Sequence, residues 1–237
     1  MEKCMEYTDS HLHLPIVSGG EEFRGGIVAS ARRCEWRTVL DACDASRYYP
    51  CIGIHPWYVL EENETALDEL EGLLREHPEC GVGEIGLDGC PGRPAMDVQR
   101  RWLHRQLEVA AKFGRIAVLH VVRAWDEAYS VLREFPKATM VIHGFHGTSD
   151  DVRRFLSFPN LCFSLGFDAM QPGKRLLAAI CSIPPERLLV DSDAPFRGHE
   201  SAELPQLITA VAAWRKVPAE ILSRQIVANW RKTVRQL

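Results

Sequence analysis

Eight short apolar segments, rich in β-branched and aromatic residues, constrain the fold of this chain more than any other feature. Each is followed by a stretch with helical periodicity or, in one case, by a loop. The segments span Tyr7–Leu14, Gly26–Ser30, Tyr49–His55, Gly81–Leu87, Ile116–Val122, Thr139–Phe145, Leu161–Phe167 and Leu188–Ser192. Because a parallel neighbour needs a crossover long enough to hold a helix, the alternation predicts a parallel sheet. Eight such units predict an α/β protein with a closed (β/α)8 TIM barrel.

The helical periodicity is strongest in four of the intervening stretches and again at the end of the chain. These helices span Glu61–His77, Asp97–Gly114, Ala124–Phe135 and Glu203–Trp214, and a terminal helix starts at Ala219. A doubly wound open sheet is the structural rival. It normally has a Gly-rich phosphate-binding turn after its first strand, and the sequence has none there. Gly19, Gly20, Gly25 and Gly26 instead predict a loop before the second strand.

Length and composition favour one globular domain over residues 1–237. The 237 residues match a single barrel of roughly 250 residues, and we find no linker or internal repeat. Hydrophobic residues at 46% and charged residues at 25% exclude disordered and fibrous classes. No apolar run approaches about 18 residues, and the start of the chain lacks the charged-then-apolar order of a secretory signal. We expect a soluble, cytoplasmic protein with no membrane contact and no obligate protein partner.

The cysteines and the net charge exclude further classes. The eight cysteines are scattered and show no C-x-x-C spacing, so we expect reduced thiols. A formal net charge of −4 argues against a surface that tracks polyanions everywhere, although a local basic rim remains open. The candidates for such a rim, which are equally typical of solvated helix charges, are Arg93, Arg100, Arg101, Arg105 and Arg123.

Residues that can bind metal occur at the ends of the predicted strands. Side chains alternate along a strand, so His11 and His13 share one face with Asp9 and can chelate a metal together. Glu84, His120, His143 and Asp193 each end a later apolar run. Barrel active sites lie at the carboxyl ends of the strands, and core packing does not explain imidazoles and carboxylates on five of them. These residues therefore predict a metal centre.

The number and type of the candidate ligands indicate which metals the site holds. They are His11, His13, Glu84, His120, His143 and Asp193. Imidazole and carboxylate without cysteine suit zinc, manganese or a similar divalent ion, and six ligands exceed what one four-coordinate ion needs. We therefore expect two divalent metal ions with Glu84 as the bridging carboxylate.

Other polar residues near the predicted strand ends suggest supporting roles. For His55 we expect a positioning or substrate-facing role rather than ligation of a metal. Asp9 and Asp88 share faces with ligands and are candidates to orient imidazoles, and Asp191 shares the face of Asp193.

The motifs that contain these residues occur together in one order. They are Asp-Ser-His-Leu-His-Leu, Gly-Ile-His-Pro, Gly-Glu-Ile-Gly-Leu-Asp, Leu-His-Val-Val-Arg-Ala, Ile-His-Gly-Phe and Asp-Ser-Asp-Ala-Pro. The sequence in this respect resembles the TatD family of metal-dependent deoxyribonucleases, within the amidohydrolase-like barrels, over a match that runs to Asn229. The resemblance implies two divalent ions on the six residues, with magnesium joining zinc and manganese as a candidate. It also implies DNA or a small phosphodiester as the substrate.

Three segments depart from the family pattern. Gly89-Cys90-Pro91-Gly92-Arg93 stands where members often carry aromatic and basic residues. Asp191 and Ser192 replace the usual Glu and Thr, and Ile-His-Gly-Phe-His-Gly-Thr replaces the more common Cys and Ser around the sixth strand. All three leave the predicted ligands in place, so they concern the substrate more than the chemistry.

The expected reaction is the attack of a metal-activated water on a phosphodiester. Glu84 and Asp193 are the expected catalytic residues, with Asp193 as general base. His55 and Arg123 are the expected substrate-binding residues, which would neutralise a neighbouring phosphate.

Other functions stay open. A two-metal amide, ester or lactone hydrolase would use the same water, and a metal-dependent phosphatase of the polymerase-and-histidinol-phosphatase type also begins with H-x-H. A non-catalytic nucleic-acid-binding scaffold is the alternative outside the enzymes.

Overall fold

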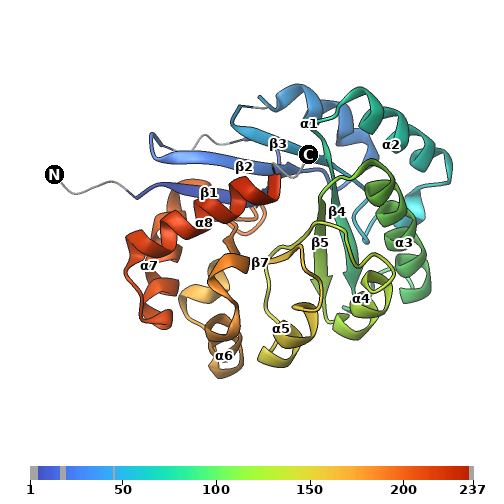
Figure 1. The fold of residues 1–237 in the computed structure, drawn as a ribbon. Coiled ribbons are helices and arrows are strands. Elements are labelled where there is room, and N and C mark those ends of the chain that lie inside the picture. Colours follow the sequence, from blue (N-terminus) through green and yellow to red (C-terminus); the bar gives the residue numbers. More distant parts are fainter. Residues whose placement is uncertain (1–4, 17–19, 45, 235–237) are drawn as a thin grey trace.

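The computed structural model describes residues 5–16, 20–44 and 46–234. Its eight parallel strands are hydrogen-bonded in chain order, and helices surround them (Figure 1). The strands are β1 Tyr7–Leu12, β2 Phe23–Ala29, β3 Tyr48–Ile52, β4 Gly81–Asp88, β5 Ala117–Val122, β6 Met140–Ile142, β7 Leu161–Leu165 and β8 Leu188–Val190. The predicted (β/α)8 barrel is therefore confirmed.

The helices occupy the connections that the periodicity predicted. They are α1 Trp36–Ala42, α2 Thr65–Glu76, α3 Met96–Phe113, α4 Trp125–Leu132, α5 Ser149–Phe155, α6 Lys174–Ser182, α7 Leu204–Arg215 and α8 Ala219–Val234. The predicted Glu61–His77 helix starts late, because Glu61 belongs to a separate 3-10 turn, Val59–Glu61. The side chain of Asn63 accepts a hydrogen bond from the Thr65 N–H at 2.9 Å, and this local turn separates the two helices.

The prediction of a loop at Gly25 was wrong, because β2 starts at Phe23, whereas Gly26 lies within β2, as the predicted strand Gly26–Ser30 required. At Gly25, which has φ +143°, a Cβ would come within 2.5 Å of the Trp230 ring and 2.9 Å of the Arg47 carbonyl oxygen. Close packing against α8 therefore requires glycine in this strand. Gly20 precedes β2 as expected, and Gly19 lies outside the described residues.

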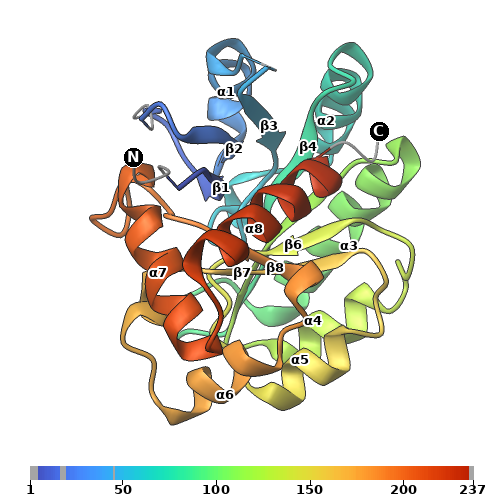
Figure 2. The ribbon, with the colours of Figure 1, turned by 60° about the vertical axis from the view of Figure 1, so that its left-hand side comes forward.

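Two apolar layers hold the barrel together. Small and β-branched side chains such as Ile27, Val118 and Val141 fill the interior, and a larger cluster packs between the strands and the surrounding helices. Helix α8 covers the amino ends of the strands, as Figure 2 shows, and Trp230 joins the interior cluster. The Asn229 side chain donates to the Leu188 carbonyl at 2.8 Å. Helix α8 thus closes the end of the barrel at which the strands begin, and the end at which the strands finish stays accessible for a functional site.

Backbone hydrogen bonds beyond the regular ladder bring the first and last strands together. The Asp193 N–H donates to the His11 carbonyl at 3.0 Å, and the His13 N–H donates to the Ala194 carbonyl at 2.7 Å. We call this junction between residues 11–13 and 193–194 the seam. It brings side chains from opposite ends of the sequence to the same rim.

Two further observations concern the whole chain. No helix among the described residues has the length and apolar character needed to cross a membrane. The seven cysteines in the described part of the chain are all free thiols, while Cys4 lies outside it.

Candidate metal centre

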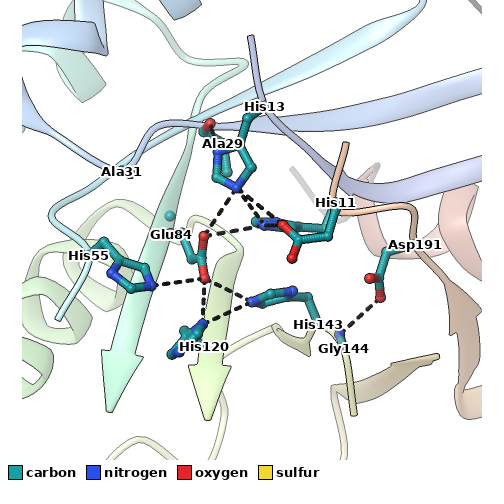
Figure 3. A network of polar contacts seen from close by, with 12 residues as sticks. His11, His13, Ala29, Ala31, His55, Glu84, His120, His143, Gly144 and Asp191 are labelled. Carbon is teal, nitrogen blue, oxygen red and sulfur yellow. Dashed lines mark hydrogen bonds and ion pairs between the residues drawn. The ribbon is translucent and has the colours of Figure 1, made fainter. Parts of the chain in front are cut away.

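The carboxyl rim of the barrel brings together all six predicted ligands and His55. Glu84 and His120 lie within β4 and β5, whereas His13, His55, His143 and Asp193 follow their strands by a few residues. Figure 3 shows His11, His13, His55, His120 and His143 converging on Glu84. Several predicted strands extend past the observed strand ends, because the backbone leaves the hydrogen-bond ladder of the sheet there. For example, the His55 N–H donates to the Ala31 carbonyl at 2.9 Å, beyond the end of β3.

The two carboxylate oxygens of Glu84 face different groups of side chains. Glu84 Oε2 lies 3.2 Å from His11 Nε2 and 3.3 Å from His13 Nε2. Asp193 Oδ1 completes this first group, at 3.6 Å from His11 Nε2 and 3.5 Å from His13 Nε2. Glu84 Oε1 lies 2.8 Å from His120 Nδ1, 2.8 Å from His143 Nε2 and 3.3 Å from His55 Nε2. Glu84 therefore stands between two clusters.

The tautomers of His13 and His55 follow from their backbone contacts. His13 Nδ1 lies 2.8 Å from the Ala29 carbonyl oxygen, so this nitrogen donates, and the neutral ring presents its Nε2 lone pair to the cluster. His55 Nδ1 accepts a hydrogen bond from the Trp57 N–H at 3.2 Å, so the proton of its neutral ring sits on Nε2. His13 can therefore ligate a cation through Nε2, whereas His55 presents an N–H to Glu84.

Asp88 supports His120 from behind. His120 Nε2 lies 3.6 Å from Asp88 Oδ2, and the same oxygen accepts a hydrogen bond from Trp57 Nε1 at 2.6 Å. Asp88 Oδ1 accepts from the Cys90 N–H at 2.8 Å. One buried carboxylate thus orients a predicted ligand and a tryptophan that borders the site.

Asp9 does not orient an imidazole as predicted; it holds the backbone of the seam. Its Oδ1 accepts from the N–H groups of His11 at 3.2 Å and Ser192 at 3.0 Å. Its Oδ2 accepts from the hydroxyls of Ser192 and Ser201, each at 2.5 Å. Burial raises the pKa of Asp9 to about 7. The contribution of Ser201 had no signal in the sequence, because it precedes α7 far from any motif.

Asp193 adopts a left-handed backbone conformation, with φ of 53°. A non-glycine residue rarely adopts this conformation, and such residues concentrate at functional sites. The seam hydrogen bond to His11 and the bond from the Phe196 N–H at 3.0 Å hold it in place. Asp191 points elsewhere: its Oδ2 accepts from the Gly144 N–H at 3.0 Å and from the Ser164 hydroxyl.

The proximity of these groups shifts their pKa values in opposite directions. Burial alone would lower the pKa of His13, but hydrogen bonds to Asp193 and Glu84 outweigh it and raise this pKa to about 10. Against the same effect of burial, hydrogen bonds to Asp88 and Glu84 raise the pKa of His120 to about 9. Burial lowers the pKa of His11 to about 4, and nearby His143 adds to this decrease. Two imidazoles therefore carry protons at neutral pH when no cation is present.

The carboxylates of the centre are ionised. Burial would raise the pKa of Glu84, but the surrounding imidazoles, His143 above all, hold it well below its usual range. Burial would also raise the pKa of Asp193, and the His13 hydrogen bond with the charge of His143 lowers it to about 2. Buried carboxylates beside imidazole lone pairs are the donor set that divalent transition metals prefer. The described residues thus fit a divalent cation, and three overlapping groups of donors lie close enough to bind one.

Two neighbouring cavities, each of about 340 Å³, open onto this centre. Both are bordered by His120, His143 and Asp193 and by the exposed aromatic side chains of Trp57 and Phe196. Sequence reasoning missed both aromatic residues, although each closely follows a motif, at His-Pro-Trp and at Asp-Ala-Pro-Phe. These aromatic surfaces, next to predicted metal ligands, offer stacking positions for planar groups.

Two arginines border one of these cavities: Arg93, which was a candidate for the basic rim, and Arg197, whereas the predicted substrate-binding residue Arg123 does not. The Arg93 guanidinium lies 3.6 Å above the Trp57 ring, with Nε 3.3 Å from Asp88 Oδ2. Arg197 Nε lies 3.5 Å from Asp193 Oδ2. Arg123 instead lines a different cavity on the rim, and none of the six predicted ligands is among the residues that line that cavity. Its backbone has φ of 51°, which ends the extended conformation of the chain directly after β5.

Comparison with known proteins gives concordant matches. The family model "TatD related DNase" matches residues 8–235. An "Uncharacterized metal-dependent hydrolase YjjV" of Escherichia coli is 24% identical and covers 94% of this chain and 95% of its own. The "3'-5' ssDNA/RNA exonuclease TatD" of Edwardsiella piscicida is 31% identical and covers 77% of this chain and 76% of its own.

Solved structures agree on the fold. The crystal structure of the E. coli TatD homologue YjjV matches with a TM-score of 0.85 at 24% identity, over 96% of this chain and 97% of that one. An uncharacterised amidohydrolase of Saccharomyces cerevisiae matches with a TM-score of 0.81 at 18% identity, over 97% of this chain and all of that one. The family model spans nearly the whole barrel and every predicted ligand, so the chain belongs to the TatD-related DNase family of metal-dependent hydrolases.

Proposed function

We propose that this TatD-related hydrolase uses two divalent metal ions to cleave phosphodiester bonds in single-stranded nucleic acid. The observation that carries the proposal is the division of the Glu84 oxygens between two groups of donors. His11, His13 and Asp193 would hold one ion with Oε2, and His120 and His143 would hold the other with Oε1. Zinc, magnesium and manganese all suit this set of donors.

Two bound ions would supply water acidified to near-neutral pKa and would polarise a phosphoryl oxygen. Asp193 has the position of the general base. Its Oδ1 faces His11 and His13, while Oδ2 remains on the side of Arg197 and the cavity, where it can accept a proton from the attacking water. The Asp193 side chain is 21% exposed, so water reaches it.

His55 supports the proposed chemistry without binding a metal. Its Nε2–H faces Glu84 Oε1 at 3.3 Å and borders the same cavity as Trp57 and Phe196. Burial lowers the pKa of His55, so the ring is neutral near pH 7, and its single N–H, on Nε2, can donate either to Glu84 or to a substrate oxygen in the cavity. The names of the single-strand exonuclease relatives favour nucleic acid as that substrate.

A matrix of metals and substrates tests this function. The purified protein should cleave single-stranded DNA and bis-p-nitrophenyl phosphate with magnesium, manganese or zinc, and it should act weakly on p-nitrophenyl esters and lactones. The variant with His11→Ala and His13→Ala should lose bound metal in elemental analysis. Strong lactonase or esterase activity without phosphodiester cleavage under any of the three metals would establish the rival two-metal hydrolase instead.

A further inference from the structure

An open groove of about 580 Å³ lies on the rim beside the metal centre. It is lined by Arg123, Trp125, His146, Gly173, Lys174, Arg175 and Leu176. His146 also borders the cavity that contains His120, His143 and Asp193, so the groove continues from that cavity. We call it the basic groove.

The three cations of the basic groove are exposed, and none forms an ion pair with a described residue. Arginines elsewhere on the rim differ in this respect: Arg93 lies against Asp88, and Arg197 against Asp193. Arg123, directly after β5, and Lys174 and Arg175, at the start of α6, thus place three positive charges without an ionic partner in one groove. The formal net charge of the whole protein is −4. Such a focus of charge attracts a polyanion.

The position of Lys174 and Arg175 is unfavourable for the fold itself. They are the first two residues of α6, where the helix dipole disfavours positive charge, and the first turn contains no acidic residue. The first turns of α2, α3, α4, α5 and α8 contain one; those of α1 and α7 do not, but a glutamate, Glu35 or Glu203, directly precedes each of these two helices, whereas Gly173 precedes α6. Helix stability does not explain cations at this position, which suggests that they serve binding.

We propose that the basic groove binds the phosphates of a polynucleotide strand whose scissile bond lies at the metal centre. The inference rests on the proposed function and deepens it, because it assigns the path of the strand beyond the scissile bond to Arg123, Lys174 and Arg175. Arg123, Lys174 and Arg175 would each contact backbone phosphate, and the exposed edge of the groove at Trp125 and His146 would adjoin the bases or sugars.

Binding measured without metal tests the groove separately from catalysis. We would titrate fluorescently labelled oligothymidylate with the protein in EDTA and follow anisotropy across a series of KCl concentrations. For single strands the logarithmic salt slope changes by about 0.7 per phosphate contact. The variant with Arg123→Gln, Lys174→Gln and Arg175→Gln should therefore show a slope smaller by about 2, with a melting temperature equal to or above that of the wild type.

The matched control carries Arg224→Gln, Arg231→Gln and Lys232→Gln. These residues are exposed on α8, which covers the opposite end of the barrel, and the substitutions change the net charge equally. The control should keep the wild-type slope. Equal effects of both triple variants, no effect of the groove variant, or equal binding of polyglutamate in the groove would overturn the proposal.

A second variant and a second substrate keep the outcomes distinct. The double variant Lys174→Gln, Arg175→Gln should lower the slope by about 1.4 if the triple variant folds poorly. The double variant should hydrolyse bis-p-nitrophenyl phosphate at the wild-type rate, because this substrate is too short to reach Lys174 and Arg175 from the metal centre. A wild-type protein that binds oligothymidylate but cleaves no phosphodiester would refute the proposed function and leave the groove supported.

Discussion

Glu84 illustrates how one side chain can organise a site. Its buried carboxylate faces the imidazoles of His11, His13, His55, His120 and His143. Such a concentration of nitrogen atoms around one anion is costly to bury unless protons or cations balance it. At the scale of single residues, the question is therefore which side chains bind a cation and which move a proton.

The substitution Asp193→Asn separates these two roles. The amide keeps the shape and one oxygen, so metal content should persist while the proton acceptor is lost. We expect kcat to fall by about 10² to 10⁴ with KM little changed. Steady-state kinetics on a metal-replete sample provide the measurement. Near-normal kcat would remove Asp193 from proton transfer, and a large loss of thermal stability would assign it to the seam instead.

The tautomer argument predicts different outcomes at His55 and His13. His55→Gln should retain the wild-type metal content, because His55 presents an N–H rather than a lone pair. His13→Gln should lose metal, because it removes a lone pair that faces Glu84 and Asp193. Elemental analysis after dialysis distinguishes the two variants. Equal metal loss in both would make His55 a ligand.

At the scale of elements, sequence pattern could predict the order of strands and helices because apolar periodicity reports burial directly. It could not predict Gly25 as a strand residue, because glycine usually signals a turn, and the reason for this glycine is the close approach of Trp230 from α8. The motifs placed six candidate ligands at strand ends. They could not reveal Arg93 above Trp57, since a loop conformation rather than a pattern brings these side chains together.

The pairing of β4 with β5 sets the positions of Glu84 and His120, and it depends on Gly86. This residue has φ of 152°, and a Cβ there would lie 1.9 Å from the His120 carbonyl oxygen. We expect Gly86→Ala to lower the free energy of unfolding by about 3 kcal/mol or more.

Gly72 in α2 provides the matched control for Gly86. A Cβ at Gly72 would meet no atom within 4 Å. Gly72→Ala should raise the free energy of unfolding by about 0.5–1 kcal/mol, because alanine loses less backbone entropy in a helix. Urea unfolding of both variants provides the comparison, and a harmless Gly86→Ala would contradict the close packing of β4 on β5.

At the scale of the whole molecule, metal binding should be linked to pH. His13 and His120, with pKa values of about 10 and 9, are protonated in the metal-free protein at pH 7. A metal that takes both ring nitrogens must displace about two protons, so its apparent affinity should rise as pH increases. Titration calorimetry of metal binding in buffers with different ionisation enthalpies measures the number of protons released. Binding without proton release would mean that these imidazoles are not ligands.

The same pKa shifts give the sign of the stability change in the metal-free protein. Both pKa values lie above the ordinary value of 6.5, so the folded state holds protons that the unfolded state has lost. Their stabilisation is complete below about pH 6.5 and disappears as pH rises through 9 and 10. The melting temperature of the metal-free protein should therefore fall as the pH rises through this window, and the melting temperature of the metal-loaded protein should fall less.

The seam has a consequence for how the protein is made. During synthesis, His11 and His13 leave the ribosome early. Asp193, which bonds to residue 11 in the seam and completes the barrel, leaves it only when most of the chain has been made. A chain that stops before β8 would carry five of the six predicted ligands, yet the backbone bonds that lock the histidine pair would be missing. Stable metal binding would thus require a full-length chain, and the metal would be bound only late in biosynthesis, after residues 193–194 have been synthesised.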